Sequence, residues 1–514
     1  MAAKAKDWVR HCSTTHAECR ALEPRSRVYP TRLLDLRNVD QTGMLPIIQV
    51  SDQFENDYAA LSYCWGGKVD WWIDYVKSCQ RTAGRDVEVV KMPQTYQDAV
   101  TICLGLGYSY LWVDCLCILQ GNKEDWLIEG ARMCEIYAGA ALTISASDSS
   151  HCTDGFLTPR SLSQREGVVL PLRNNDGRVG CLHLYLPDTD FPTLVGHGPV
   201  AQRAWCLQER QIARRVLHVC QSEVFFECVR CRRFESERIP GDEFDVNDEF
   251  LAFHMPRDVH DLGRGKPARD VRNVLSWYSI VQDYTRRGLT FPGDKLIAIS
   301  GLAKHAQQFF GGEYLAGLWR KQLHIGLAWM IEEADFATRA AAPYRAPSWS
   351  WASMDGPVSW HLIDGWVQSD DGFLESAIDL VDSSVDLLGS DPLGPVRYAE
   401  ITVSGRVKYI PAAELLHNKV LTYPAWMSGA SSHLGWYMED EKGVLDAENI
   451  ACLKIATRPF GPGPSLPPTN EMIILERVES VENEALDKYR RIGFGQVMVT
   501  AYFDDCPMRT VILI

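Results

Sequence analysis

The chain has 514 residues, more than one hydrophobic core usually serves, so two or three domains are expected. A net charge of −15 excludes a broad nucleic-acid surface, because phosphate binding needs clustered Lys and Arg. No apolar run approaches the ~20 residues of a membrane span and the start of the chain lacks a signal-peptide core, so a cytoplasmic protein is expected.

Sixteen cysteines raise the question of disulfides or zinc. Without a secretory signal thiols stay reduced, and many of these lie in apolar runs, where cysteine behaves as a small hydrophobic residue. Two local clusters, Cys12-x3-His16-x2-Cys19 and Cys228-x2-Cys231, each lack a complementary pair of ligands nearby in the sequence. Free buried thiols and no metal site are therefore the expectation.

The first predicted elements are short. Residues 28–37 are typical of an edge strand entering the core, and residues 46–50 and 58–63 predict two further strands. Residues 71–79 have helical spacing of their apolar positions, and residues 87–90 predict another strand.

The strand over 58–63 ends in a tight turn. It runs into Trp65, Gly66 and Gly67, and a double glycine lets the backbone approach a ligand closely. The spacing matches neither a dinucleotide-binding nor a Walker fingerprint, so it predicts no phosphate cradle.

The stretch from 93 to 146 predicts an αβαβ unit. Apolar residues from Tyr96 to Leu106 recur at helical spacing, and Tyr110 to Val113 is an apolar run typical of a strand buried on both faces of a parallel sheet. Asp114 follows this strand directly, at the edge where open α/β sheets bind ligands. Ligand contact is predicted for Asp114, with capping of the next helix as the alternative.

A second helix is predicted to start at Asn122, or at the acidic residues after it, and to reach Tyr137. Trp126 and Met133 belong to its apolar stripe, and Trp126 is also a candidate cleft-lining residue. Glu129 lies on the shoulder of that stripe. A half-buried carboxylate there has a pKa that its surroundings can tune, although a surface or capping salt bridge is the alternative.

The middle of the chain is polar and of mixed charge. Strands are predicted over 167–173 and 177–187, and a hairpin over 216–228. Between them, Arg203, Gln208 and Glu209 are expected either to line the same cleft as Asp114 or to form a buried ion-pair network.

A helical region is predicted over 271–360 and a β-rich region over 361–514, following an α/β core over 1–160 and accessory strands over 161–270. Trp349 and Trp351 share one face if extended, where they would cover a ligand pocket or bury apolar surface. The strands after residue 400 favour a sandwich or a barrel-like module.

Several long blocks carry a resemblance to a known family. They are YAALSYCWGG (58–67), MPQTYQDAVTICLGLGYSYLWVDCLCILQ (92–120), EDWLIEGARMCEIYAGAALTISA (124–146), RAWCLQERQIARRVLHVCQSEVFFEC (203–228) and APSWSWASMDGPV (346–358). In this order they resemble the heterokaryon-incompatibility (HET) domain of fungal proteins and the blocks that accompany it in stand-alone members. The resemblance covers residues 8 to 360.

The resemblance implies intracellular non-self recognition or programmed cell death in a filamentous fungus. HET domains are similar to Toll/interleukin-1-receptor (TIR) domains, which implies a flavodoxin-like parallel sheet and, as in some TIR enzymes, NAD cleavage. The implied catalytic carboxylate is Glu129, three positions after Trp126 where four is usual. Tyr63, Trp65, Gly66 and Asp114 would contact the nucleotide, with core or lid packing as the alternative for Tyr63 and Trp65. NAD is then a substrate, and no tightly bound cofactor is expected.

Two other functions fit the same sequence. One is a non-enzymatic signalling module that acts by self-association or through a protein partner. The other is a HET scaffold recruited as a biosynthetic cyclase or isomerase, which an apolar cavity lined by Trp and Tyr would favour.

Overall fold

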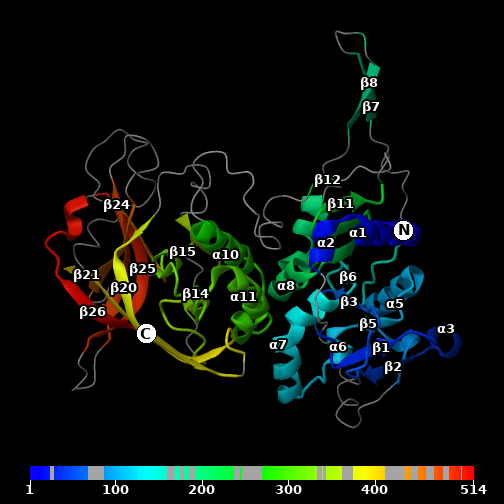
Figure 1. Cartoon of the computed structure of the whole chain (residues 1–514), viewed down its shortest axis with the longest axis horizontal. Helices are drawn as coiled ribbons and strands as arrows, with labels where there is room; N and C mark the ends of the chain where they lie inside the picture. Colours follow the sequence, from blue (N-terminus) through cyan, green and yellow to red (C-terminus); the bar gives the residue numbers. More distant parts are fainter. Residues whose placement is uncertain are drawn as a thin grey trace. The chain divides into compact units, whose positions relative to one another are not determined.

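The computed structural model describes residues 1–22, 28–67, 86–158, 168–173, 177, 179–184, 191–236, 244–245, 269–332, 338–339, 343–361, 374–389, 391–410, 435–441, 450–458, 468–478, 486–498 and 500–514. The chain forms two compact units, Met1–Met255 and Pro256–Ile514 (Figure 1). The finer division into four regions stays a prediction. No helix among the described residues is both long and apolar enough to cross a membrane.

A ten-stranded mixed sheet is the centre of the first unit. Its four middle strands run parallel in the order β5-β3-β6-β9, and the strands outside them pair antiparallel. The mixed α/β class is therefore as expected. In spatial order the strands are β12 (Phe244–Asp245), β11 (Cys231–Phe234), β10 (Val224–Cys228), β9 (Arg215–Val219), β6 (Leu142–Ser145), β3 (Ala59–Ser62), β5 (Tyr110–Trp112), β1 (Arg32–Asp35), β2 (Met44–Gln49) and β4 (Asp86–Glu88).

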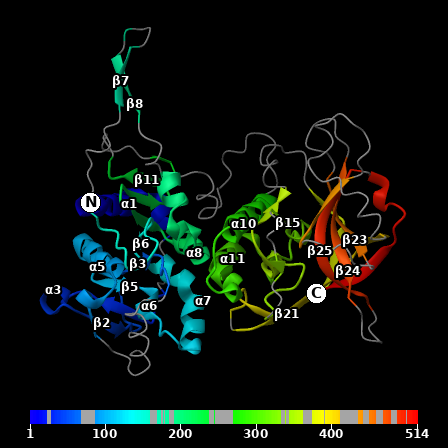
Figure 2. The ribbon, with the colours of Figure 1, turned by 180° about the vertical axis from the view of Figure 1, so that it is seen from behind.

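Helices connect the parallel strands and cover the sheet. In the two views α5 lies on one side of β3 and β6, and α7 and α8 lie on the other (Figures 1 and 2). Every residue of β3, β5 and β6 is buried, as in strands covered on both faces, including the polar Thr143 and Ser145 of β6. The helices of this unit are α1 (Ala2–Thr15), α2 (Ala17–Ala21), α3 (Val39–Thr42), α5 (Gln94–Leu106), α6 (Asp114–Cys117), α7 (Lys123–Gly139) and α8 (Ala204–Ile212).

The predicted αβαβ unit is confirmed in α5, β5, α7 and β6. One detail of the neighbouring predictions is wrong. The strand near residue 32 is not at an edge, because β1 lies between β5 and β2. The segment that begins at Asp114 forms the short helix α6.

The predicted hairpin is β9–β10, and β7 (Val168–Arg173) pairs with β8 (Val179–Leu184) in a separate hairpin. The predicted helix over 71–79 lies outside the described residues.

The start of α7 is as predicted. The Asn122 side-chain oxygen accepts hydrogen bonds from the backbone N–H groups of Glu124 and Asp125, at 3.0 and 3.1 Å. These bonds satisfy two donors that have no partner within the helix.

Asn122→Ala should therefore destabilise the first unit by about 1 kcal/mol. Urea denaturation, with hydrogen exchange of α7 peptides to identify the unit, measures the loss. Asn38→Ala is the matched control, because Asn38 is at the N-cap of α3 without a side-chain cap bond. Equal losses in the two variants would contradict this role of the Asn122 side chain.

The second unit combines helices with a β-rich region, as expected. The helices are α10 (Arg269–Thr285), α11 (Ile297–Phe310) and α12 (Leu323–Gly326). Short two-stranded pairs lie between the helices and the large sheet: β13 (Tyr314–Leu315) with β14 (Leu318–Trp319), β15 (Trp329–Ile331) with β18 (Val358–Trp360), and β16 (Thr338–Arg339) with β17 (Met354–Asp355).

The eight-stranded sheet of this unit closes on itself. The long strand β21 pairs with β26 and also with β23, and β23, β24, β25 and β26 pair in succession. This ring fits the barrel-like alternative among the sequence expectations. Its strands are β19 (Glu375–Ser376), β20 (Ile378–Leu387), β21 (Val396–Ile410), β22 (Gly435–Glu439), β23 (Ile450–Arg458), β24 (Thr469–Arg477), β25 (Lys488–Val497) and β26 (Met508–Leu513).

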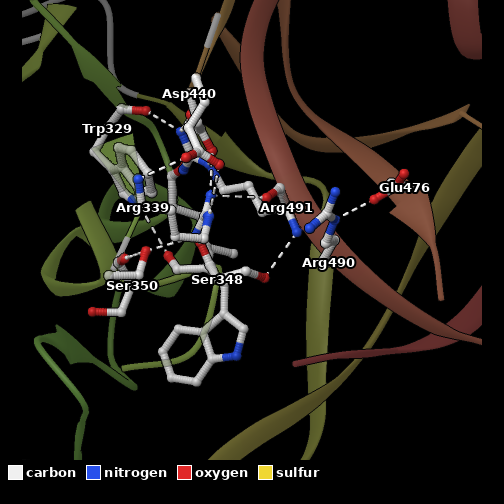
Figure 3. A network of polar contacts seen from close by, with 12 residues as sticks. Trp329, Arg339, Ser348, Ser350, Asp440, Glu476, Arg490 and Arg491 are labelled. Carbon is white, nitrogen blue, oxygen red and sulfur yellow. Dashed lines mark hydrogen bonds and ion pairs between the residues drawn. The ribbon is translucent and has the colours of Figure 1, made fainter. Parts of the chain in front are cut away.

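A buried arginine joins this barrel to the short strand β15. The guanidinium of Arg491 in β25 donates to the carbonyls of Leu327 and Trp329 and to the carboxylate of Asp440, and it lies over the Trp329 ring at 3.4 Å (Figure 3). Arg339 also donates to Asp440, at 3.3 Å.

Trp349 and Trp351 belong to the core of this same unit. Both indoles are fully buried, and their N–H groups donate to the carbonyls of Leu513 and Gly317 at 3.1 and 3.0 Å. Their surfaces are thus covered by protein within the second unit, whereas Asp114 lies in the first.

Candidate functional site

Asp114 is the centre of a polar cluster at the carboxyl ends of β3 and β5. The Tyr63 hydroxyl donates to its Oδ1 at 2.7 Å, and the Trp65 indole N–H donates to its Oδ2 at 2.9 Å. The backbone N–H of Cys115 donates to Oδ1 at 2.6 Å. Because β3 and β5 are parallel neighbours, their carboxyl ends meet at one edge of the sheet. Three residues predicted to share a site are thus in direct contact.

Burial controls the protonation of this cluster. It raises the pKa of Asp114, although the hydrogen bonds from Tyr63 and Trp65 oppose the rise. Burial also raises the pKa of Tyr63 well above its usual value, and the nearby Asp114 charge adds to the effect. Tyr63 therefore stays a protonated donor. Its oxygen accepts in turn from the Tyr96 hydroxyl at 3.0 Å, a contact that the sequence did not reveal because Tyr96 is one of the apolar positions of α5.

Helix α8 adds a cation and a second carboxylate. Arg203, at the N-cap of α8, donates to the Tyr63 carbonyl. Glu209 is buried on the same helix, and burial raises its pKa to about 7, against the lowering effects of the Ser62 hydrogen bond and the Arg203 charge. Asp114 raises the pKa of Glu209 further through its negative charge. A carboxyl group that titrates near neutral pH is suited to acid–base chemistry.

Gly66 has a packing role. It has a φ of +74°, and a Cβ atom there would lie 2.0 Å from the His151 ring. The turn after β3 therefore packs closely against the loop after β6. This requires glycine for reasons independent of a ligand. Gln208, the neighbour of Glu209, is also buried.

Glu129 is more buried than its place on the helix predicts. The expected half-buried position is wrong, since only 1% of the residue is exposed. Its Oε1 accepts from the Thr31 hydroxyl and lies 3.6 Å from Arg132 Nη1. Thr31 lies just before β1, and helical periodicity alone does not predict its contact with Glu129. Trp126, on the same helix, packs edge-to-face with Trp205.

A second buried network lies at the ends of β6 and β9. Ser147 Oγ is 3.1 Å from His218 Nδ1, and His218 Nε2 is 3.2 Å from Glu227 Oε2. The order hydroxyl, imidazole, carboxylate is that of a nucleophile and its base. However, all three residues are at most 2% exposed, and Glu227 also accepts from Arg210 and Arg232 at 2.8 Å.

The two guanidiniums hold the pKa of Glu227 well below its usual value although burial opposes this, and burial lowers the pKa of His218. Both ring nitrogens of the neutral imidazole have a hydrogen-bond partner, a hydroxyl on one side and a carboxylate on the other, as is usual for a buried polar side chain. We therefore assign a structural role to Ser147, His218 and Glu227. The sequence did not predict this network, because Ser147 follows β6 while His218 and Glu227 lie in β9 and β10.

Comparison with known proteins gives one match. Residues 58–209 match the family described as heterokaryon incompatibility protein (HET), and this range contains the Asp114 cluster, Glu129 and Glu209. Neither the curated proteins nor the solved structures gave a match.

Proposed function

We propose, from the match of residues 58–209 to the HET family, that the chain acts in a heterokaryon-incompatibility response through a ribonucleotide site at the carboxyl edge of β3 and β5. One observation carries the proposal. Asp114 and Glu209, two buried carboxylates, are positioned with Arg203 at the ends of adjacent parallel strands. Buried ionisable groups at such an edge are typical of a functional site.

The order of the strands supports this placement. Counted along the chain, the parallel strands β5-β3-β6-β9 have the order 2-1-3-4, which is that of flavodoxin-like sheets. In those sheets ligands bind beyond the carboxyl ends of the strands, where the strand order reverses. This point lies between β3 and β6, where Ser62 pairs with Ser145. It is on the β6 side of β3, and Glu209 reaches it through its hydrogen bond with Ser62, while Asp114 lies on the β5 side.

The chemistry that fits best is cleavage of the nicotinamide glycosidic bond of NAD. The transition state has ribosyl-cation character, and a fixed carboxylate stabilises the developing positive charge. We assign this role to Glu209 in place of Glu129. The reason is position: Glu129 contacts Thr31 and Arg132, whereas Glu209 lies close enough to Asp114 for the Asp114 charge to raise the pKa of Glu209.

The test is nicotinamide release by the full chain supplied with NAD. Wild type should release nicotinamide, and Glu209→Gln should lower kcat by about 10²-fold or more, the usual effect of removing one electrostatic group from an active site. Glu129→Gln is the matched control and should retain most of the rate. Circular dichroism checks that both variants fold. No release by folded wild type, or equal rates for wild type and Glu209→Gln, would reject the assignment.

One observation favours the non-enzymatic alternative. Asp114 already accepts from Tyr63, Trp65 and the Cys115 N–H, so its carboxylate is engaged within the protein. If the cluster only stabilises the fold, Glu209→Gln should keep full toxicity on expression in fungal cells, and signalling would depend on self-association. Loss of toxicity together with loss of nicotinamide release supports the enzyme instead. The recruited cyclase or isomerase stays a prediction.

A further inference from the structure

The two cysteine clusters that are separate in the sequence meet in the structure. Cys12, His16, Cys19 and Cys228 place four ligand atoms within 4.8 Å of one another. His16 Nδ1 is 3.4 Å from Cys228 Sγ and 3.8 Å from Cys19 Sγ. Cys12 is at most 1% exposed, as are Cys19 and Cys228, and His16 is 7% exposed. We propose that these four residues form a structural zinc site that attaches the N-terminal helices to β10.

The two distances from His16 Nδ1, 3.4 Å to Cys228 Sγ and 3.8 Å to Cys19 Sγ, are close to those of tetrahedral coordination. Zinc binds thiolate sulfur at about 2.3 Å and imidazole nitrogen at about 2.0–2.1 Å, which puts tetrahedral ligands roughly 3.5–3.8 Å apart. Three cysteines and one histidine are a common set for structural zinc. Because four protein ligands complete the shell, the site has no open position for substrate or water.

The local structure explains how the ligands come together. Cys12 lies near the end of α1, and His16, four residues later, is the residue between α1 and α2. Cys19 follows in α2, while Cys228 ends β10. The sequence could not show this set because its fourth member is more than two hundred positions away, and a zinc knuckle is recognised by short spacing.

Two hydrogen-bond donors face the ligand sulfurs. Arg215 Nε donates to Cys12 Sγ at 3.2 Å, and the backbone N–H of Cys231 donates to Cys228 Sγ at 3.4 Å. Three thiolates on Zn²⁺ carry a net charge of −1, and the Arg215 guanidinium places a positive charge beside them. Donors that bind the ligand sulfurs in this way orient and stabilise metal sites.

The site is structural rather than catalytic because of its place on the sheet. Arg215 begins β9, so the four ligands lie at the amino edge of the parallel strands. The Asp114 cluster lies at the carboxyl edge. The zinc site therefore does not depend on the proposed nucleotide chemistry, and either can fail alone.

The test is the metal content of the full chain, purified under reducing conditions and supplied with Zn²⁺. Wild type should hold one zinc per chain, and Co²⁺ in its place should give the visible bands of a tetrahedral site and thiolate-to-metal charge transfer. Folded wild type that takes up neither ion overturns the proposal, whether its thiols stay free or form disulfides.

Variants identify the ligands. Cys12→Ser, Cys228→Ser and His16→Ala should lose the zinc, while His16→Cys, which restores a fourth ligand, should keep it. Cys103→Ser is the matched control, since Cys103 is a buried thiol of α5 outside the group, and it should keep one zinc. Chelation of wild type should speed hydrogen exchange in α1 and α2. Stoichiometric zinc in Cys12→Ser or Cys228→Ser would overturn the assignment.

Discussion

Replacing Arg491 by methionine should destabilise the second unit by about 3–5 kcal/mol, the usual cost of removing one partner of a buried ion pair. Arg491 is fully buried, and Asp440 is 1% exposed. Its guanidinium donates to Asp440 from Nε at 3.1 Å and from Nη2 at 3.2 Å, and Nη1 donates to Leu327 O at 2.7 Å (Figure 3). Methionine fills similar space but leaves Asp440 with Arg339 alone and the carbonyls of Leu327 and Trp329 without this donor.

The neighbouring residue provides the control. Arg490 pairs with Glu476 on the other side of β25, with 46% of its side chain exposed (Figure 3). Exposed pairs are worth about 0–1 kcal/mol, so Arg490→Met should cost no more than that. Guanidinium denaturation measures both variants, and hydrogen exchange of β15 and β25 peptides assigns the loss to the second unit. Similar costs for the two arginines would contradict a special role for the buried network.

Patterns in short stretches of the sequence correctly predicted the elements that depend on interactions between near neighbours in the chain. The helix after Pro93, the strand ending before Asp114 and the cap at Asn122 are all visible in short windows, because periodicity and capping act within a few residues. The meeting of Tyr63, Trp65 and Asp114 was also predictable, since parallel strand ends share an edge.

Contacts between distant segments were not predictable in this way. Glu129 accepts a hydrogen bond from Thr31, a residue 98 positions earlier, so helical periodicity could not reveal this contact. Cys228 joins Cys12 and Cys19 only when β10 meets the N-terminal helices. The sequence around Arg491, which lies in a strand, did not predict that its charge would be buried.

Glu209 should make the first unit less stable as the pH rises. Its pKa is about 7 in the folded chain, against an ordinary value of 4.5, because burial disfavours the charged form. Because the pKa of Glu209 is raised in the folded chain, its contribution to the free energy of unfolding is fully present below pH 4.5 and is lost as the pH rises through 7. The shift corresponds to about 3 kcal/mol between these limits. The ionised Glu209 of the proposed active site therefore lowers the free energy of unfolding.

The measurement is the difference in unfolding free energy between wild type and Glu209→Gln from pH 4 to pH 8. Carboxylates distant from Glu209 titrate alike in both proteins and cancel, so the variant should gain about 3 kcal/mol on wild type as the pH rises, mostly between pH 4.5 and 7. Glu55→Gln, at an exposed side chain, should follow wild type throughout. Parallel curves for wild type and Glu209→Gln would mean that Glu209 titrates alike in the folded and unfolded chain. Glu209 would then lack the perturbed pKa on which its catalytic assignment partly rests.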